Sequence, residues 1–192
     1  MPNLYIIAGP NGAGKTTASY TILPEVLNCY EFVNADEIAR GISPLKPEKA
    51  SFEAGKLMLT QIKKHVDQEL DFAIETTLST KTYTELIQNA QKKGYKVTLL
   101  FFWLSSWEAA QARVAKRVEE GGHNIPSEII ERRFKRGLFN LFNVFIPLCN
   151  DWMVIDNNSE TKPIAQNIDN TLKIFESEKF EHIKIEARKY EY

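Results

Sequence analysis

The sequence predicts an α/β fold in which helices cover both faces of a five-stranded parallel sheet. Three observations support this prediction. The length of 192 residues is enough for one well-buried domain and short for two. Short apolar runs alternate with stretches of helical spacing, as in a parallel sheet wrapped by helices. A glycine-rich turn separates the first apolar run from the first helical stretch. We therefore expect one three-layer α/β/α domain over residues 1–192.

Three strands and two helices are predicted in the first half of the chain. A helix should begin at Lys15 and end near Leu23, because Pro24 cannot continue the hydrogen-bonding pattern. A long amphipathic helix should follow from Pro47, which suits a first helical turn, to Leu70. Residues 4–8 form an apolar run that predicts a buried first strand, and residues 30–33 and 72–74 predict the second and third strands.

The middle of the chain predicts a central strand between two helices. Residues 80–93 should form a helix, with Gly94 in the position that follows a helix end. Residues 95–104 are the most apolar stretch, which favours a strand buried on both faces. Ser106 is a suitable N-cap for a helix running to Glu120, where Gly121-Gly122 interrupts the pattern.

The last part of the chain predicts two further helices and one strand. A helix should restart at Pro126 and run past Asn140. Residues 152–155 predict the fifth strand, and residues 162–177 predict a helix after it. The tail from Glu178 is charged and has no clear place in the sheet.

Composition excludes several classes of function. The net charge is −1 and the pI about 6.3, so no overall positive field attracts nucleic acid or an anionic membrane. No apolar run reaches the roughly 20 residues needed to cross a bilayer, and no signal peptide is expected. The two cysteines, Cys29 and Cys149, lack CxxC spacing. These features favour a cytoplasmic protein with reduced thiols.

The glycine-rich turn has the spacing G-x-x-x-x-G-K-T of a P-loop. It consists of Gly9, Pro10, Asn11, Gly12, Ala13, Gly14, Lys15 and Thr16, with Thr17 following. Glycines let backbone N–H groups point at phosphate oxygens, and the helix N-terminus adds partial positive charge. Lys15 should reach the β- and γ-phosphates, and the Thr16 hydroxyl should be a Mg²⁺ ligand. The motif therefore predicts a P-loop NTPase fold that binds ATP and Mg²⁺.

The reaction class follows from motifs that the sequence lacks. There is no guanine-reading NKxD motif, which GTPases carry. There is also no apolar strand ending in Asp followed directly by a catalytic Glu, the usual mark of a mechanical ATPase. A kinase is the remaining class.

Asp36 is the first candidate for catalysis. It lies just after the second predicted strand, and ligands of open parallel sheets bind at the carboxyl ends of strands. A positioned carboxylate there could accept the proton of the acceptor hydroxyl. The alternative is that Asp36 caps the helical stretch that follows it. Arg40, one turn later, could pair with Asp36 or bind a substrate phosphate.

Glu75 ends the third predicted strand and should point into the same crevice. Together with Thr76 it is a candidate for substrate binding. Glu75 could bind a sugar or ribose hydroxyl, or hold a magnesium-bound water. The alternative is a structural cap on the following loop.

Residues 113–136 carry seven Lys/Arg and four Glu, a local charge of +3 in a nearly neutral protein. Some of these cations have acidic partners at helical spacing, but Arg113, Arg133 and Arg136 have none. We expect a lid at about residues 118–128 that closes arginines over a charged transition state. His123 in this segment is a candidate for substrate contact. The alternative is a set of ordinary surface arginines.

The ordered set of motifs resembles the zeta toxin family of P-loop kinases. The matching segments are GPNGAGKTT from Gly9, Asn34-Ala35-Asp36, residues 74–79 (IETTLS), the arginines Arg113 and Arg117, GGHNIP from Gly121, and Arg132-Arg133-Phe134. They lie between residue 9 and about residue 140. The lid is shorter than in the toxins proper, and no segment for binding an antitoxin is obvious.

The resemblance implies a function and a role for each matching residue. Characterised members phosphorylate a sugar hydroxyl of UDP-N-acetylglucosamine with ATP. Lys15 and Thr16 would hold phosphate and magnesium, and Asp36 would be the general base. Glu75 would contact the substrate. Arg117 and Arg133 would stabilise the transferring phosphoryl group, and His123 falls near the place of the toxins' second arginine.

Three hypotheses remain at this point. The first is a small-molecule kinase that acts on a nucleotide sugar. The second is a 5′-polynucleotide kinase, which needs a basic groove that the net charge of −1 disfavours. The third is a non-catalytic ATP-binding component of a toxin–antitoxin pair, with an antitoxin protein as its partner.

Overall fold

The computed structural model describes residues 1–122 and 124–190. In this part of the chain a single sheet of seven strands has the order β2-β3-β1-β4-β5-β6-β7. The first five strands are parallel: β1 (Asn3–Ala8), β2 (Glu31–Val33), β3 (Phe72–Thr76), β4 (Lys96–Trp103) and β5 (Asp151–Asp156). The last two, β6 (Lys162–Ile168) and β7 (Thr171–Ile174), extend the sheet in antiparallel pairs. The parallel α/β fold is confirmed, with two more strands than predicted.

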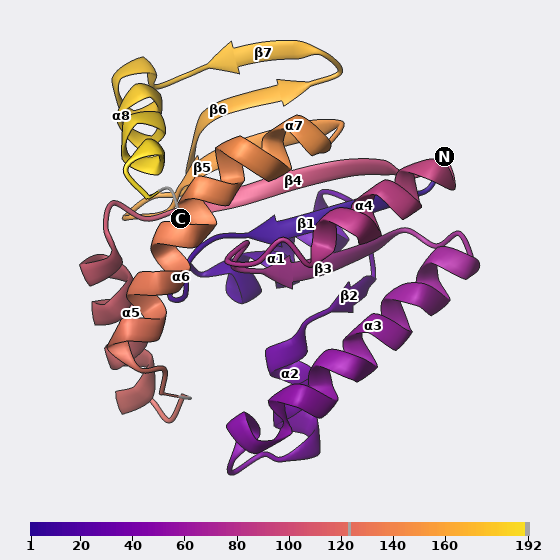
Figure 1. The fold of residues 1–192 in the computed structure, drawn as a ribbon, viewed down its shortest axis with the longest axis vertical. Helices are drawn as coiled ribbons and strands as arrows, with labels where there is room; N and C mark the ends of the chain where they lie inside the picture. Colours follow the sequence, from indigo (N-terminus) through magenta and orange to yellow (C-terminus); the bar gives the residue numbers. More distant parts are fainter. Residues whose placement is uncertain (123, 191–192) are drawn as a thin grey trace.

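Helices flank this sheet along its length. Figure 1 shows α2 and α3 beyond the β2 edge and α8 beside the opposite end, near β6. The α-helices are α1 (Lys15–Glu25), α2 (Ala35–Ile42), α3 (Ser51–Asp67), α4 (Tyr83–Lys92), α5 (Trp107–Glu119), α6 (Ser127–Asn140), α7 (Ile146–Leu148) and α8 (Ser177–Arg188). A 3₁₀ turn, η1 (Pro47–Ala50), precedes α3, and a π-helical segment, η2 (Leu141–Phe145), joins α6 to α7.

The core lies along the two central strands, β1 and β4. Ile6 and Phe102 are completely buried, as is Phe72 of the neighbouring strand β3. Strands covered on both faces carry continuous apolar runs rather than alternating ones. For this reason the apolar run over residues 95–104 predicts the central strand. In the sheet, the carboxyl ends of β3, β1 and β4 lie side by side.

The predicted helix over residues 162–177 is wrong, because this segment forms the β6–β7 hairpin. Asp169 and Asn170 have φ of 49° and 60°, and the flanking Ile168 and Thr171 pair with each other. Two consecutive residues with positive φ are typical of a tight hairpin turn, and Asp and Asn tolerate that conformation better than most residues. The tight turn at Asp169 and Asn170 therefore divides the segment into two strands, the first of which pairs with β5.

The charged tail from Glu178 also has a place in the fold. It belongs to α8, whose Phe180, Ile183 and Ala187 are buried. The ring of Phe180 stacks on that of Trp152 in β5, with centroids 6.0 Å apart. The apolar face of this helix thus covers the outer part of the sheet.

Several helix boundaries differ from the prediction. Helix α1 continues through Pro24 to Glu25, because proline near a helix end removes only one internal hydrogen bond, and Val26 N–H still reaches the Ile22 carbonyl at 3.1 Å. The predicted helix over residues 47–70 is divided into η1 and α3. Helix α2 was not predicted, although Asp36 was considered as a cap at this point.

Gly121 and Gly122 close helix α5. The Gly122 N–H bonds to the Arg117 carbonyl at 2.8 Å and the Gly121 N–H to that of Val118 at 3.0 Å, with Gly121 at φ +90°. This pair of bonds is a Schellman cap. The lid over residues 118–128 stays a prediction, and its boundary coincides with this cap. Within the described residues, none of the helices combines the length and apolar character that crossing a bilayer requires.

Candidate functional site

The P-loop connects the end of β1 to the start of α1, as the sequence predicts. Strand β1 lies between β3 and β4, so the loop sits at the carboxyl edge of the three central strands. Gly9 passes so close to β4 that a Cβ would lie 2.3 Å from the Phe102 carbonyl oxygen. Gly14, the last residue before α1, has φ of 75°. At these two positions the chain needs glycine for the loop to curl.

Two polar contacts from outside the motif hold the loop in place. The Asn157 side chain, just after β5, donates from Nδ2 to the Ala13 carbonyl at 2.7 Å. Arg113 of α5 donates to the Asn158 carbonyl at 2.6 Å and approaches the Gly12 carbonyl at 3.5 Å. Arg113 has no acidic partner at helical spacing. It connects α5 both to the segment after β5 and to the P-loop.

Lys15 lies beneath the loop with 6% of its surface exposed. Its Nζ donates to the Pro10 carbonyl at 3.0 Å and lies 3.7 Å from Glu75 Oε1. Burial lowers the pKa of Lys15, while the negative charges of Glu75 and Asp36 act in the opposite direction. The charge of Arg117 also lowers this pKa, so Arg117 acts on the same site. The ammonium group is thus enclosed next to the loop that the sequence assigns to phosphate.

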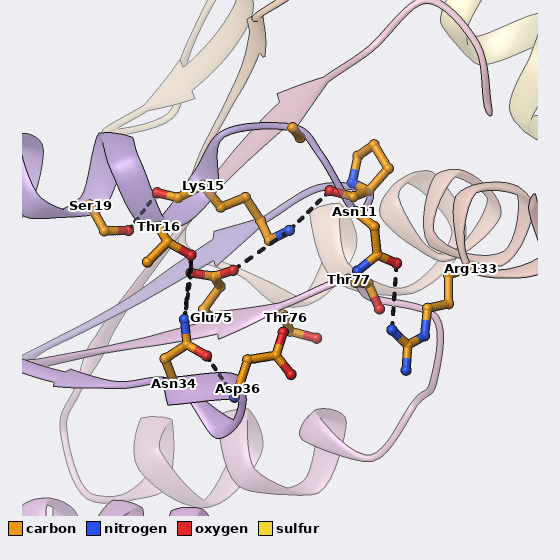
Figure 2. Close-up of polar contacts among 12 residues, drawn as sticks. Asn11, Lys15, Thr16, Ser19, Asn34, Asp36, Glu75, Thr76, Thr77 and Arg133 are labelled. Carbon is orange, nitrogen blue, oxygen red and sulfur yellow. Dashed lines mark hydrogen bonds and ion pairs between the residues drawn. The ribbon is translucent and has the colours of Figure 1, made fainter. Parts of the chain in front are cut away.

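Glu75 at the end of β3 forms a hydrogen-bonded cluster with Thr16 and Asn34 (Figure 2). Thr16 Oγ1 donates to Glu75 Oε2 at 2.8 Å, and Asn34 Nδ2 donates to the same oxygen at 2.9 Å. Burial raises the pKa of Glu75, and the nearby charge of Lys15 opposes this rise. Glu75 therefore contacts the P-loop residues Thr16 and Lys15 directly.

Asp36 lies in the first turn of α2 and is not its cap. The N-cap is Asn34, whose Oδ1 accepts hydrogen bonds from the N–H groups of Asp36 at 2.9 Å and Glu37 at 3.4 Å. The Asp36 side chain is exposed, and no hydrogen bond or ion pair within the described residues engages its carboxylate. Arg40 pairs with Glu37 at 3.0 Å rather than with Asp36. The carboxylate of Asp36 is therefore accessible beside the Lys15–Glu75 pair.

Of the two arginines predicted for the lid, Arg133 of α6 approaches the P-loop, with Nη1 3.5 Å from Asn11 Oδ1. Arg117 of α5 lowers the pKa of Lys15 through its charge. Arg132, the neighbour of Arg133, lines a different groove, of about 520 Å³, between α6 and the C-terminal end of α8. His123 lies outside the described residues.

Helix α6 packs against the loop that follows Glu75. The Leu78 N–H donates to Thr76 Oγ1 at 3.1 Å, so the hydroxyl of the predicted substrate-binding residue Thr76 accepts a backbone hydrogen bond. Asn140 donates to the Leu78 carbonyl at 2.7 Å, and a Cβ on Gly137 would lie 2.4 Å from the Thr77 carbonyl oxygen. The helix that carries Arg133 is thus anchored to the loop that follows β3.

An apolar groove of about 300 Å³ adjoins the N-terminus of α2. It lies between α2, α3 and the start of α4, and its lining includes Ala35, Phe52, Met58 and Tyr83. Burial raises the pKa of Tyr83, and the charge of Asp36 adds to that rise. Ala35, the residue before Asp36, lines the groove. An organic acceptor could thus be bound next to the exposed carboxylate.

The residues at the P-loop fit a magnesium ion held together with phosphate. Mg²⁺ prefers oxygen ligands, keeps several waters and uses one or two protein groups besides substrate phosphates. The Thr16 hydroxyl and the Glu75 carboxylate, 2.8 Å apart, supply such oxygens. Elsewhere in the described part of the chain, no three His, Cys, Asp or Glu side chains gather as a metal site.

Sequence reasoning missed three asparagines of this site. Asn34 follows β2, and Asn157 and Asn158 follow β5. Each stands at the carboxyl end of a parallel strand, which is where the carboxylates were sought. The same positional signal, applied to amides as well as to acids, would have identified them.

Comparison with protein families agrees with this geometry. The profile of the family described as Zeta toxin matches residues 1–169. A protein of Haemophilus influenzae, described as uncharacterized, is 29% identical over 126 residues, which cover 66% of this chain and 88% of that protein.

Two solved structures share the fold over nearly the whole chain. The AvrRxo1-ORF1:-ORF2 structure with ATP has a TM-score of 0.77 at 19% sequence identity. The match covers 95% of this chain and 63% of the chain in that structure. A structure from work on the PezAT chromosomal toxin–antitoxin system of Streptococcus pneumoniae has a TM-score of 0.69 at 17% identity, covering 99% of this chain and 87% of the other. At these identities the similarity establishes the fold.

Proposed function

Because the chain belongs to the zeta toxin family, we propose that it is a kinase that transfers the γ-phosphoryl group of ATP to a hydroxyl of a small molecule. One observation carries this proposal. Lys15, Glu75 and Thr16 meet at the P-loop, with the exposed carboxylate of Asp36 close enough to influence Lys15 (Figure 2). This arrangement supports a phosphate-binding site at the P-loop with Asp36 as the proton acceptor beside it.

The chemistry needs few groups because phosphoryl transfer is mainly a matter of position and charge. The P-loop N–H groups and Lys15 bind the phosphates, and Asp36 aims the acceptor hydroxyl and takes its proton. The acceptor oxygen then bonds to the γ-phosphorus as the bond to the ADP oxygen breaks. Thr16 and Glu75 would hold Mg²⁺, which supplies charge neutralisation on the phosphates when bound. Arg117 and Arg133 stabilise the charge that spreads over the transferring group.

We propose a nucleotide sugar of the UDP-N-acetylglucosamine type as the acceptor, as the family resemblance implies. The apolar groove beside Asp36 supports a small organic acceptor, since its volume of about 300 Å³ matches a ring system rather than a long polymer. The net charge of −1 speaks against the 5′-polynucleotide kinase alternative. Arg40 and His123 remain candidates for contact with the acceptor.

A role in a toxin–antitoxin pair is a second candidate. Both solved structures named above come from systems of two proteins. One is an ORF1:ORF2 complex, and the other belongs to a toxin–antitoxin system. An antitoxin protein is therefore the partner that we propose to seek. An Asp36→Asn variant that keeps every cellular effect of the wild type would favour this non-catalytic function.

The first prediction tests the reaction and the acceptor together. Incubation with ATP, Mg²⁺ and UDP-N-acetylglucosamine is expected to add one phosphoryl group to the sugar nucleotide, detected by mass spectrometry. A metabolite extract in a parallel incubation would reveal a different acceptor. If ATP is consumed but no small molecule gains a phosphoryl group, the small-molecule kinase proposal is wrong.

Gly55 offers a matched test of the groove. It lies on α3 in the groove wall, and a Cβ there would meet nothing within 4 Å. Gly55→Leu should fill the groove and raise the KM for the acceptor by about 10-fold or more, with the KM for ATP unchanged. Gly55→Ala, which adds only one methyl group, is the control.

The third prediction concerns the arginines. Arg117→Lys and Arg133→Lys keep the charge but lose the planar fork, so each should lower kcat by on the order of 10-fold or more, with ATP affinity little changed. Arg132→Lys is the control, because Arg132 lines the groove on the other side of α6. Equal losses in all three variants would mean that the arginine assignment is wrong. Losses below a few-fold in all three would place the catalytic cation elsewhere.

A further inference from the structure

Asn34 is the single residue between strand β2, which ends at Val33, and helix α2, which begins at Ala35. It is buried, with 6% of its surface exposed. Both ends of its side-chain amide are used. Oδ1 accepts from the backbone N–H of Asp36 at 2.9 Å, and Nδ2 donates to Glu75 Oε2 at 2.9 Å. One short side chain therefore contacts the backbone of one candidate carboxylate residue and the side chain of the other.

The orientation of this amide follows from its neighbours. The backbone N–H groups of Asp36 and Glu37 can only donate, so they require the oxygen of the amide. Glu75 Oε2 is a carboxylate oxygen that accepts hydrogen bonds, one of them from Thr16. Its contact with Asn34 therefore requires the amide nitrogen, which donates. A rotated amide would lose both sets of bonds inside a buried site.

We propose that Asn34 is a positioning residue that holds Asp36 and Glu75 in a fixed relation, and so connects the acceptor side of the site to the phosphate side. The proposal rests on the function proposed above. The oxygen end fixes where α2 starts and hence where the Asp36 side chain emerges. The nitrogen end fixes the Glu75 carboxylate against Thr16. A hydrogen bond from the amide to an ionised carboxylate is stronger than one between neutral groups, which suits such a role.

Substitution can separate the two ends of the amide. Serine and aspartate are both good N-caps, so Asn34→Ser and Asn34→Asp should preserve the start of α2. Serine is too short to reach Glu75, and aspartate places a second carboxylate oxygen against it. Asn34→Ala removes both functions. The control is Ser106→Ala, which removes another N-cap, the one that accepts from Ala109 N–H at the start of α5.

The experiment measures melting temperature and steady-state kinetics with ATP and UDP-N-acetylglucosamine on all four variants. Asn34→Ala and Ser106→Ala should each lower the melting temperature by about 2–4 °C, as expected for a lost cap in a protein of this size. Asn34→Ser should melt close to the wild type, and Asn34→Asp should melt lower because its carboxylate lies against that of Glu75. Both variants should lose about 10- to 100-fold in kcat, with the KM for ATP changed less than about threefold. Ser106→Ala should keep the wild-type kcat.

A purely structural role for Asn34 gives a different pattern. In that case Asn34→Ser and Asn34→Asp, which retain the cap, would keep kcat within about twofold of the wild type, and the proposal would be overturned.

Failure of the proposed function is recognised separately, because the wild type itself would then transfer no phosphoryl group. Calorimetry then decides: the gain in ATP affinity on adding Mg²⁺ should shrink about 10-fold in Asn34→Ser and Asn34→Asp but not in Ser106→Ala. An unchanged gain would overturn the proposal.

Discussion

Replacing Lys15 by alanine is expected to weaken ATP binding by on the order of 10²–10⁴-fold. The Lys15 ammonium is buried beneath the P-loop, 3.0 Å from the Pro10 carbonyl. On binding, it would exchange this contact for charge-assisted hydrogen bonds to phosphate oxygens, each worth about 1.5–3 kcal/mol. Isothermal titration calorimetry with ATP and Mg²⁺ measures the loss directly.

Two further variants show that this loss is specific. Lys64→Ala removes an exposed lysine on α3 and should bind ATP like the wild type. Lys15→Ala also leaves Glu75 buried without its cation, which costs stability. The double variant Lys15→Ala/Glu75→Gln removes that cost, and it should recover melting temperature but not ATP binding. Wild-type affinity in Lys15→Ala would contradict the assignment of the phosphate site.

Replacing Asp36 by asparagine is expected to lower turnover by on the order of 10²–10⁴-fold while ATP affinity stays unchanged. This is the usual contribution of a general base. The substitution keeps the shape of the side chain, and Asp36 is exposed, so the fold should be unaffected. Phosphoryl transfer under saturating ATP and acceptor gives kcat, and calorimetry gives the ATP affinity.

Glu37→Gln is the matched control for Asp36→Asn. Glu37 lies next to Asp36 in the first turn of α2, so both variants lose one negative charge near the same helix N-terminus. Only the Asp36 variant should lose turnover. If Asp36→Asn keeps its turnover, Asp36 is not the base, and Glu75 becomes the better candidate. Equal losses in both variants would indicate that the helix terminus, rather than the carboxylate of Asp36, is responsible.

The parts of the fold nearest the P-loop were predictable because the sequence there has one strong physical interpretation. Glycines with lysine and threonine after an apolar run define the phosphate loop. Continuous apolar runs define strands buried on both faces, and the runs of β1 and β4 predict the two central strands in this way. The rule that ligands gather at the carboxyl ends of strands led to Asp36 and Glu75, which the structure brings close together.

Other features depend on contacts that a single sequence does not reveal. The hairpin over residues 162–174 depends on positive φ at Asp169 and Asn170, whereas its apolar spacing resembles that of a helix. Arg113 has no acidic neighbour in the sequence, and its partner, the Asn158 carbonyl, is 45 residues away. Asn34 has a local function as a cap and a distant one at Glu75, and only the local one could be expected from its position.

The packing of Gly137 against the Thr77 carbonyl gives helix α6 the geometry of a lever with a fixed pivot. The C-terminal part of the helix is held there and by Asn140 at Leu78. At a rise of 1.5 Å per residue, Arg133 lies about 6 Å from the pivot and Ser127 about 15 Å from it. A rotation of about 10° would move Arg133 by about 1 Å and Ser127 by about 2.6 Å. Any rotation about this pivot therefore displaces Ser127 about two and a half times as far as Arg133.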